Sequence, residues 1–447
     1  MLTVNAKSGM KMENYISKYL NYLQFWKHIF SYLTTIPDTN EFDQKVSDLV
    51  RRSERLTITY QVVRRGLDQT NIPTVNEFGY RRFNMVDWII AVASLAVVSR
   101  FAVLTFSTNE TIAIYLGDTF LHGKDRFLCE SYLAIALSLA FGCREWILHL
   151  EAKGQFEVLA IWKHCRDGFK VVNLRMNSRN IKRFRFCIYF FSIIFYNMLI
   201  SVPIMLSILF VTTLLTNPWT YKIPEFAIFG TIWLLLTIFV STILLSSVLG
   251  FAWFILCAFA FHLFRLLDLL DSAETLLNRS YNMLYTEKDF QLFCLLIISR
   301  LNSFELASRK LRYVLLCYVF IYSLLGNGDI FLGLIVRAYN DIFADSLATI
   351  GTSILIAPGV FGVLFGYLIT ELDKLTVRLH RLTFKGNFSV NTMSKVLEIM
   401  DRVAGPYNGV KIGDFTTVDK TFFIIFILEN ISILMLFTVN IRPLSVT

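Results

Sequence analysis

The sequence predicts an all-α membrane protein with seven transmembrane helices, and two observations support that fold class. Hydrophobic residues make up 55% of the 447 residues and charged residues only 17%. In a soluble domain, about a quarter of the residues are usually charged. The apolar residues are also gathered into long runs, and about 20 apolar residues suffice for a helix to span a bilayer. A β-barrel would instead show short segments of alternating hydrophobicity.

Seven apolar runs are long enough to span a bilayer. The fourth run is much longer than a bilayer requires, so we expect its helix to continue below the membrane. The predicted spans are Val86–Phe106, Ser131–Leu150, Cys187–Leu215, Phe226–Phe264, Val314–Val336, Leu347–Thr370 and Thr417–Val439.

The loops between the spans indicate the orientation through their Lys and Arg content. The segment before the first span and the second, fourth and sixth loops are rich in these residues, whereas the first, third and fifth loops are not. Because cytoplasmic loops carry the excess of positive charge, the N-terminus is expected in the cytoplasm and the C-terminus outside. This direction is opposite to that of G-protein-coupled receptors. A glycosylation sequon at Asn109-Glu110-Thr111 agrees with an outer first loop.

The long cytoplasmic segments predict helices outside the membrane. After Asn391, the residues Met393, Val396 and Met400 share one face of a helix that needs an apolar partner. The expected partner is the extension of the fourth span, which would give a helical bundle beneath the membrane. The alternative is that this face lies on the membrane surface.

The spans and loops together predict the following organisation: 1–85, a cytoplasmic N-terminal helical region; 86–264, transmembrane helices 1–4; 265–312, cytoplasmic anchor helices; 313–371, transmembrane helices 5–6; 372–414, a cytoplasmic loop and anchor helix; 415–447, helix 7 and a short outer tail.

No enzymatic site is expected. The sequence has no phosphate-binding loop, zinc-protease motif or nucleophile elbow, and its six histidines are scattered. We therefore predict no catalytic residue, no bound metal and no cofactor. The net charge of +9 is explained by cytoplasmic loops that face anionic lipids, without a nucleic-acid partner.

Glu429 and Asn430 interrupt the otherwise apolar seventh span. An ionisable residue in a span usually faces a cavity or a partner. Glu429 either lines a water-filled pore, where its charge would attract cations, or lies buried between helices. Ser432, Met435 and Val439 follow it at helical spacing, so one face of the helix is a candidate pore lining.

The outer halves of the fourth and sixth spans hold a candidate ligand pocket. Trp233 lies at the level of Thr231, Thr349 and Thr352, and aromatic walls with a few hydroxyl groups are typical of small-molecule sites. Ordinary helix packing is the alternative interpretation for each of these residues.

One local motif and the overall layout resemble a known family. Residues 413–419, Gly-Asp-Phe-Thr-Thr-Val-Asp, resemble the start of the last helix in the insect gustatory and odorant receptor superfamily. The seven spans, the inner N-terminus and the long fourth span resemble that family over nearly the whole chain. The family's Thr-Tyr and Gln signature is absent. In one register, Ile431-Ser432 and Thr438 stand in its place; in the other, it begins at Thr421-Phe422 and Leu428 replaces the Gln. This departure suggests a divergent member, such as the gustatory-receptor-like proteins of nematodes or other non-insect animals.

The resemblance implies a tetrameric, stimulus-gated, non-selective cation channel in the plasma membrane of sensory cells. The last helices of four identical or related subunits would line the pore, with Met435 at an apolar gate and Thr438 just outside it. A ring of Glu429 would favour cations. The implied partners are membrane lipids, cations and a small molecule or other sensory stimulus, bound in the outer half of helices 2–6.

Three other functions stay open at this stage. The chain could signal as a metabotropic receptor of inverted topology through its basic second inner loop. It could sense light or peroxide, as some nematode members of the family do. It could be a transporter, although transporters often show internal repeats and none is found here. Sugars, bitter compounds and temperature are further candidate stimuli.

Overall fold

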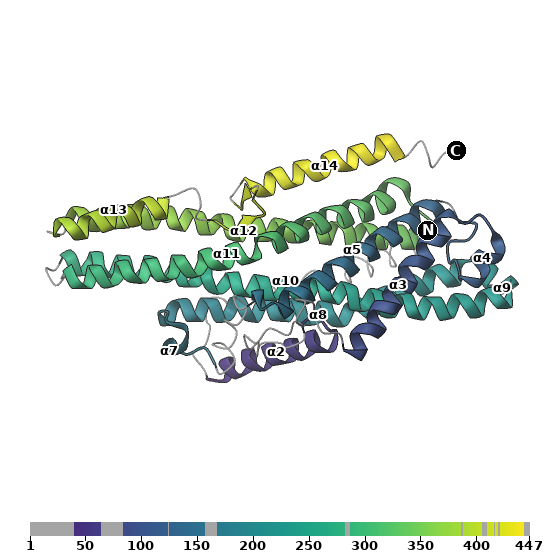
Figure 1. Cartoon of the computed structure of the whole chain (residues 1–447), viewed down its shortest axis with the longest axis horizontal. Coiled ribbons are helices and arrows are strands. Elements are labelled where there is room, and N and C mark those ends of the chain that lie inside the picture. Colours follow the sequence, from purple (N-terminus) through teal and green to yellow (C-terminus); the bar gives the residue numbers. More distant parts are fainter. Residues whose placement is uncertain are drawn as a thin grey trace, which may run out of the picture.

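The computed structural model shows an elongated bundle of long helices, with two short helices at one end (Figure 1). Much of the predicted N-terminal region, together with Phe415 and Asp419 of the family-like motif, lies outside the described residues. The structure describes residues 40–63, 84–123, 125–156, 168–281, 287–385, 388–404, 409–414, 416–418 and 421–441.

Within the part of the chain that the structure describes, seven helices are long and apolar enough to cross a membrane, which confirms the predicted fold class. A π-helical turn, η2 (Phe331–Val336), ends the fifth of them. The seven helices are α3 (Met85–Phe106), α5 (Arg126–Ala152), α8 (Ser178–Thr216), α10 (Pro224–Tyr281), α11 (Glu287–Ile330), α12 (Asp341–Lys385) and α14 (Phe422–Ile441). The remaining elements are α2 (Asn40–Thr59), α4 (Glu110–Tyr115), α7 (Val171–Leu174), α9 (Trp219–Lys222), α13 (Val390–Ala404), β1 (Lys411–Ile412) and β2 (Thr416–Thr417).

Four of the seven helices run far beyond the predicted spans. The 58 residues of α10 make a continuous helix about 87 Å long at 1.5 Å per residue, which confirms the predicted extension of the fourth span. Helices α8 and α11 begin well before the predicted spans, and α12 ends after Thr370. Charged residues lower the hydropathy of these extensions, yet their apolar faces are buried, as at Phe184, Phe304 and Leu379.

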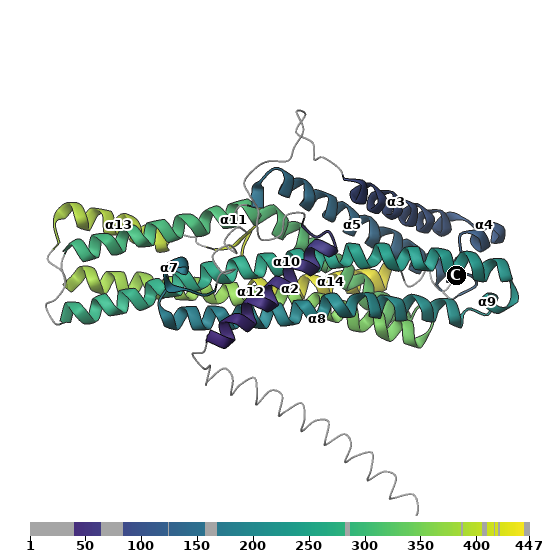
Figure 2. The ribbon, with the colours of Figure 1, turned by 90° about the horizontal axis from the view of Figure 1, so that it is seen from below.

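The extensions of α10, α11 and α12 form a bundle with α13 at the end opposite to α4 and α9 (Figures 1 and 2). By the orientation inferred from the basic loops, this end is cytoplasmic. The predicted helix after Asn391 is confirmed as α13. The expected partner of this helix was the extension of the fourth span, α10. Its main contacts are instead with α12 and α11. The Glu287 carboxylate at the start of α11 accepts hydrogen bonds from Ser389 Oγ (2.6 Å) and Thr392 Oγ1 (2.5 Å) at the start of α13.

A buried ion pair joins three helical segments near the base of this bundle. The Arg300 guanidinium of α11 donates to Asp268 Oδ2 of α10 at 2.9 Å, and both side chains are almost fully buried. Arg300 also donates to the carbonyl oxygens of Arg265 and Arg175. The other oxygen of Asp268 accepts from Asn180 of α8 at 3.1 Å. The pair therefore fixes α8, α10 and the turn before α8 against α11.

The last helix begins later than predicted. Thr417 was expected to open the seventh span, but Thr416 and Thr417 pair antiparallel with β1 as a small hairpin, and α14 starts at Phe422. β-Branched residues favour an extended backbone, and Gly413 takes the positive φ of 59° at the turn. The Gly413 N–H donates to the Arg312 carbonyl at 2.9 Å, so the hairpin fixes the start of α14 to α11.

We expect Arg300→Ala to lower the free energy of unfolding by about 3–5 kcal/mol, because it leaves Asp268 buried without its cation. The measurement is denaturant unfolding of the purified protein in micelles, followed by tryptophan fluorescence. Arg309→Ala is the matched control, since Arg309 is exposed and pairs with Glu305 on its own helix, and we expect a change within about 0.5 kcal/mol. Equal losses in both variants would show that the buried pair has no special role.

Candidate functional site

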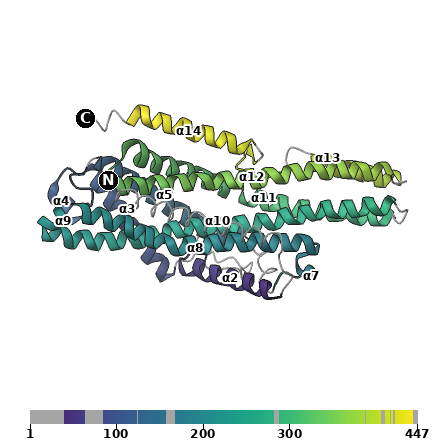
Figure 3. The same ribbon diagram turned by 180° about the vertical axis from the view of Figure 1, so that it is seen from behind.

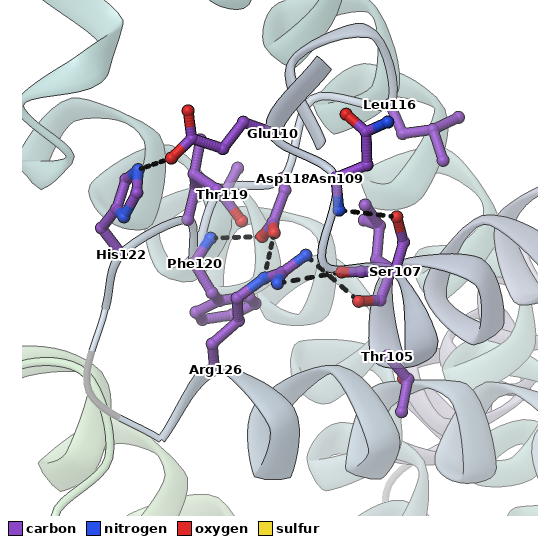
Figure 4. A network of polar contacts seen from close by, with 12 residues as sticks. Thr105, Ser107, Asn109, Glu110, Leu116, Asp118, Thr119, Phe120, His122 and Arg126 are labelled. Carbon is purple, nitrogen blue, oxygen red and sulfur yellow. Dashed lines mark hydrogen bonds and ion pairs between the residues drawn. The ribbon is translucent and has the colours of Figure 1, made fainter. Parts of the chain in front are cut away.

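A compact cap closes the outer end of the bundle between α3 and α5. Asp118 is fully buried and accepts hydrogen bonds from the Arg126 side chain and from the Phe120 N–H. Arg126 also donates to the carbonyl oxygens of Ser107 (3.2 Å) and Leu104 (3.1 Å) at the end of α3 (Figure 4). One guanidinium therefore joins the end of α3, the loop and the start of α5.

A second arginine, which is buried, fixes the same cap to the middle of the bundle. Arg100 of α3 donates to the carbonyl oxygens of Leu116 (2.7 Å) and Gly117 (2.6 Å), and to Thr237 Oγ1 of α10 at 3.3 Å. Gly117 has a φ of +61°, and a Cβ there would lie 2.6 Å from Gly230 Cα of α10. The loop backbone therefore touches the α10 backbone, which requires glycine at Gly117.

Trp233 is part of this cap. Its indole N–H donates to the Tyr115 carbonyl at 3.3 Å, and the Arg100 guanidinium lies 5.5 Å from the centre of its ring. The side chain thus holds the loop after α4 against α10. The sequence predicted Trp233 as part of a pocket wall. In the structure it also has a structural role, because it attaches the loop after α4 to α10.

The three predicted pocket threonines are exposed on the surface of their helices. Thr231 donates to Ala227 O (2.7 Å), and Thr349 and Thr352 donate to the carbonyl oxygens of Asp345 and Ala348 (both 2.8 Å). Among the described residues, no hydrogen bond joins Trp233 to Thr349 or Thr352. Their common role in a ligand pocket stays a prediction.

A different cavity opens beside the cap. It has a volume of about 230 Å³ and is lined by His122, Thr216, Trp219, Tyr339 and Asn340, among others. The His122 ring stacks on Trp219 with 4.8 Å between the ring centres. The Tyr339 hydroxyl donates to the Thr213 carbonyl at 2.8 Å and accepts from Thr216 Oγ1 at 3.2 Å. We call this cavity the outer pocket.

Two residues that line the outer pocket have a strained backbone. His122 and Tyr339 have φ values of 58° and 65°, a left-handed region that is costly for residues other than glycine. Such conformations persist where the surrounding structure imposes them, often at ligand sites. The sequence did not predict this pocket, because loops have no hydrophobic periodicity. The aromatic and amide residues around Pro218 were the feature that could have indicated it.

Helix α14 lies along α12 and α11 and leaves most of its surface uncovered (Figure 3). Met435 is 64% exposed and Val439 is 71% exposed, and Glu429 and Ser432 are also exposed. Thr438 is half-buried and donates to the Leu434 carbonyl. The residues proposed for the pore are thus largely uncovered within one chain.

Asn430 determines which face of α14 is covered. It is 4% exposed, and its Oδ1 accepts hydrogen bonds from Ser323 Oγ and Asn327 Nδ2 of α11, both at 2.7 Å. At about 100° per residue, Ser432 and Met435 then point away from α11. Glu429 and Thr438 lie on opposite flanks between these two faces. The sequence showed Asn430 beside Glu429, but only the contact with α11 identifies its task.

We expect Asn430→Leu to destabilise the protein by about 1 kcal/mol, the usual scale of a hydrogen bond between membrane helices, because Ser323 and Asn327 lose their acceptor. Denaturant unfolding in micelles measures the change. Ser432→Ala is the control, since the Ser432 hydroxyl bonds only to Leu428 O of its own helix among the described residues. A stability of Asn430→Leu equal to that of the control would argue against the anchor.

Comparison with known proteins identifies the fold. No family model matches the sequence, and no curated protein matches it. The structure of the insect olfactory receptor OR5 from Machilis hrabei is similar, with a TM-score of 0.56 and 12% identity, over 92% of this chain and 98% of that chain. The same receptor in complex with eugenol gives a TM-score of 0.55 and 12% identity, over 90% and 98% of the two chains.

Proposed function

We propose that this chain, which has the fold of the insect odorant and gustatory receptor superfamily, is a subunit of a chemosensory cation channel. The observation that carries the proposal is α14, an apolar helix fixed along one side by Asn430 and exposed along the other. Exposed apolar residues are ordinary next to lipid, but the ionisable Glu429 on that surface is not. A water-filled pore, formed by several copies of the chain around one axis, would solvate Glu429 and would also be lined by the exposed apolar residues of α14.

The pore lining follows from the rotation that Asn430 imposes. Ser432 and Met435 point away from α11 and would face the axis, so Met435 is the proposed apolar gate. Glu429 is exposed on one flank, where a ring of carboxylates would draw cations to the pore. Thr438 lies on the other flank of α14 and is half-buried. It can lie beside the gate only if a neighbouring subunit packs close to that flank.

The outer pocket is the proposed place where a small molecule is first bound. Aromatic walls at His122, Trp219 and Tyr339, with amide and hydroxyl groups at Asn340 and Thr216, have the usual make-up of such sites. Small aromatic molecules are the first class to screen, because the similar olfactory receptor was solved with eugenol. The predicted site around Trp233 is the second place to test.

We expect Glu429→Gln to reduce the preference for cations over anions and Met435→Ala to alter gating, because the first removes the charge and the second removes the apolar constriction. Current recording in oocytes measures both, with a stimulus found by a ligand screen. Glu225→Gln is the control, since this exposed carboxylate lies in the first turn of α10, away from α14 in the sequence. Unchanged selectivity and gating in both α14 variants would remove α14 from the pore.

We expect Tyr339→Phe to raise the stimulus concentration for half-maximal current by about 5- to 30-fold, the effect of losing one or two hydrogen bonds at about 1 kcal/mol each. The maximal current should be retained, because the pore is untouched. Thr349→Ala is the control for the predicted pocket on α12. A shift with Thr349→Ala and none with Tyr339→Phe would move the site away from the outer pocket.

A further inference from the structure

Two carboxyl groups of the outer cap are completely buried and in contact. Asp118 lies in the loop after α4 and Glu130 lies near the start of α5, and neither side chain has exposed surface. The two carboxyl groups form a side-chain hydrogen bond with each other. An ionised carboxylate can only accept hydrogen bonds, so this contact requires a proton on one of the two groups.

Asp118 is the ionised member of the pair. The Arg126 side chain donates to one of its oxygens and the Phe120 N–H donates to the other (Figure 4), and such donors favour the charged form. Neither oxygen of Glu130 accepts a hydrogen bond within the described part of the chain. A carboxylate that is buried without donors is costly, so Glu130 is the group that holds the proton.

Two arginines lie near Glu130, but their donors are directed to other acceptors. Arg126 donates to Asp118 and to two backbone carbonyls at the end of α3. Arg100 donates to two backbone carbonyls of the loop after α4 and to the Thr237 hydroxyl of α10. Among the described residues, neither arginine forms an ion pair with Glu130. Both arginines therefore attract an ionised Glu130 only from a distance.

The other titratable groups that face the pair supply no positive charge. Asp125 adds a negative charge at the start of α5, and Cys129 lies next to Glu130 on the same helix. Tyr339 approaches Asp118 from the turn before α12. Thiol and phenol groups are ordinarily uncharged near neutral pH. The surroundings therefore favour a proton on the pair over a second carboxylate.

We propose that Asp118 and Glu130 form a proton-binding site in the outer cap, in which protonated Glu130 donates its hydrogen to Asp118. Each oxygen of Asp118 can accept a second hydrogen bond, because it has two lone pairs. The proton then joins α5 to the loop after α4. Its loss would set two negative charges against each other, so the cap would loosen as the outer medium becomes alkaline.

The site uses no residue of α14 or of the outer pocket. It therefore holds whether or not the chain conducts ions.

The proton makes the stability of the folded chain depend on pH. Between about pH 5 and about pH 7 an unfolded carboxyl group is ionised, since its ordinary pKa is about 4. The folded chain keeps one more proton over that range, so its stability falls as the pH rises. Each pH unit should raise the equilibrium constant for unfolding by about tenfold through this pair.

Denaturant unfolding of the full chain in micelles, repeated across this pH range, tests the proposal. Glu130→Gln replaces the protonated carboxyl by an amide that donates to Asp118 but does not titrate. We expect this variant to fold and to lack the tenfold change per pH unit. Glu225→Gln is the control, since Glu225 is an exposed carboxylate in the first turn of α10, and it should keep the full change.

Infrared spectra give a second measurement, because a protonated carboxyl has a carbonyl band that a carboxylate lacks. At neutral pH the full chain should show this band, and Glu130→Gln should have lost the part that belongs to Glu130. If Glu130→Gln fails to fold, Asp118→Asn takes its place. The asparagine amide donates to an ionised Glu130 and removes the opposing charge, so the same part of the band should be lost.

Two results would overturn the proposal. An equal pH dependence of unfolding in the full chain and in Glu130→Gln would show that Glu130 binds no extra proton. An infrared band that is the same in the full chain and in the variant would show that Glu130 is ionised, with water or an ion between the two carboxylates.

Discussion

The hydrogen bonds that Asn430 accepts from Ser323 and Asn327 are the constraint on which the candidate pore depends. A buried amide without partners is costly in a medium that holds no water, so α14 has one preferred rotation against α11. Apolar contacts alone would permit several rotations, since apolar residues occur on every side of α14. The polar contact therefore decides which residues are left for a pore or a neighbouring subunit.

The same principle acts at the two ends of the bundle. Arg100 and Arg126 fix the outer cap to α3, α5 and α10, and Arg300 with Asp268 fixes α8, α10 and α11 at the inner end. Each arginine donates to backbone carbonyls as well as to a side chain, so loops and helices are joined in one network. Much of the helix surface between the outer cap and the Arg300–Asp268 pair is apolar. The polar groups at the two ends therefore define how the helices are aligned along their length.

The sequence predicted the seven spans well, because hydropathy depends only on the residues within a span. It did not predict how far α8, α11 and α12 extend, since charged residues mask faces that become apolar contacts only after packing. It placed the start of the last helix at Thr417, where pairing with residues 411 and 412 gives a strand instead. The outer pocket was missed because its walls come from three loops distant in sequence. The division into domains and the roles of Glu429, Met435 and the threonines stay predictions.

The length of α10 has a mechanical consequence. It contains no proline after its first residue, so no proline interrupts it between the outer cap, where it meets Arg100 and Gly117, and the inner bundle, where it carries Asp268. A rigid rod about 87 Å long that tilts by about one degree around one end moves its other end by about 1.5 Å. If α10 pivots at its end in the cap, a movement close to that pivot can be too small to break any hydrogen bond there. The same tilt would still shift the helices far below the membrane by an atomic distance.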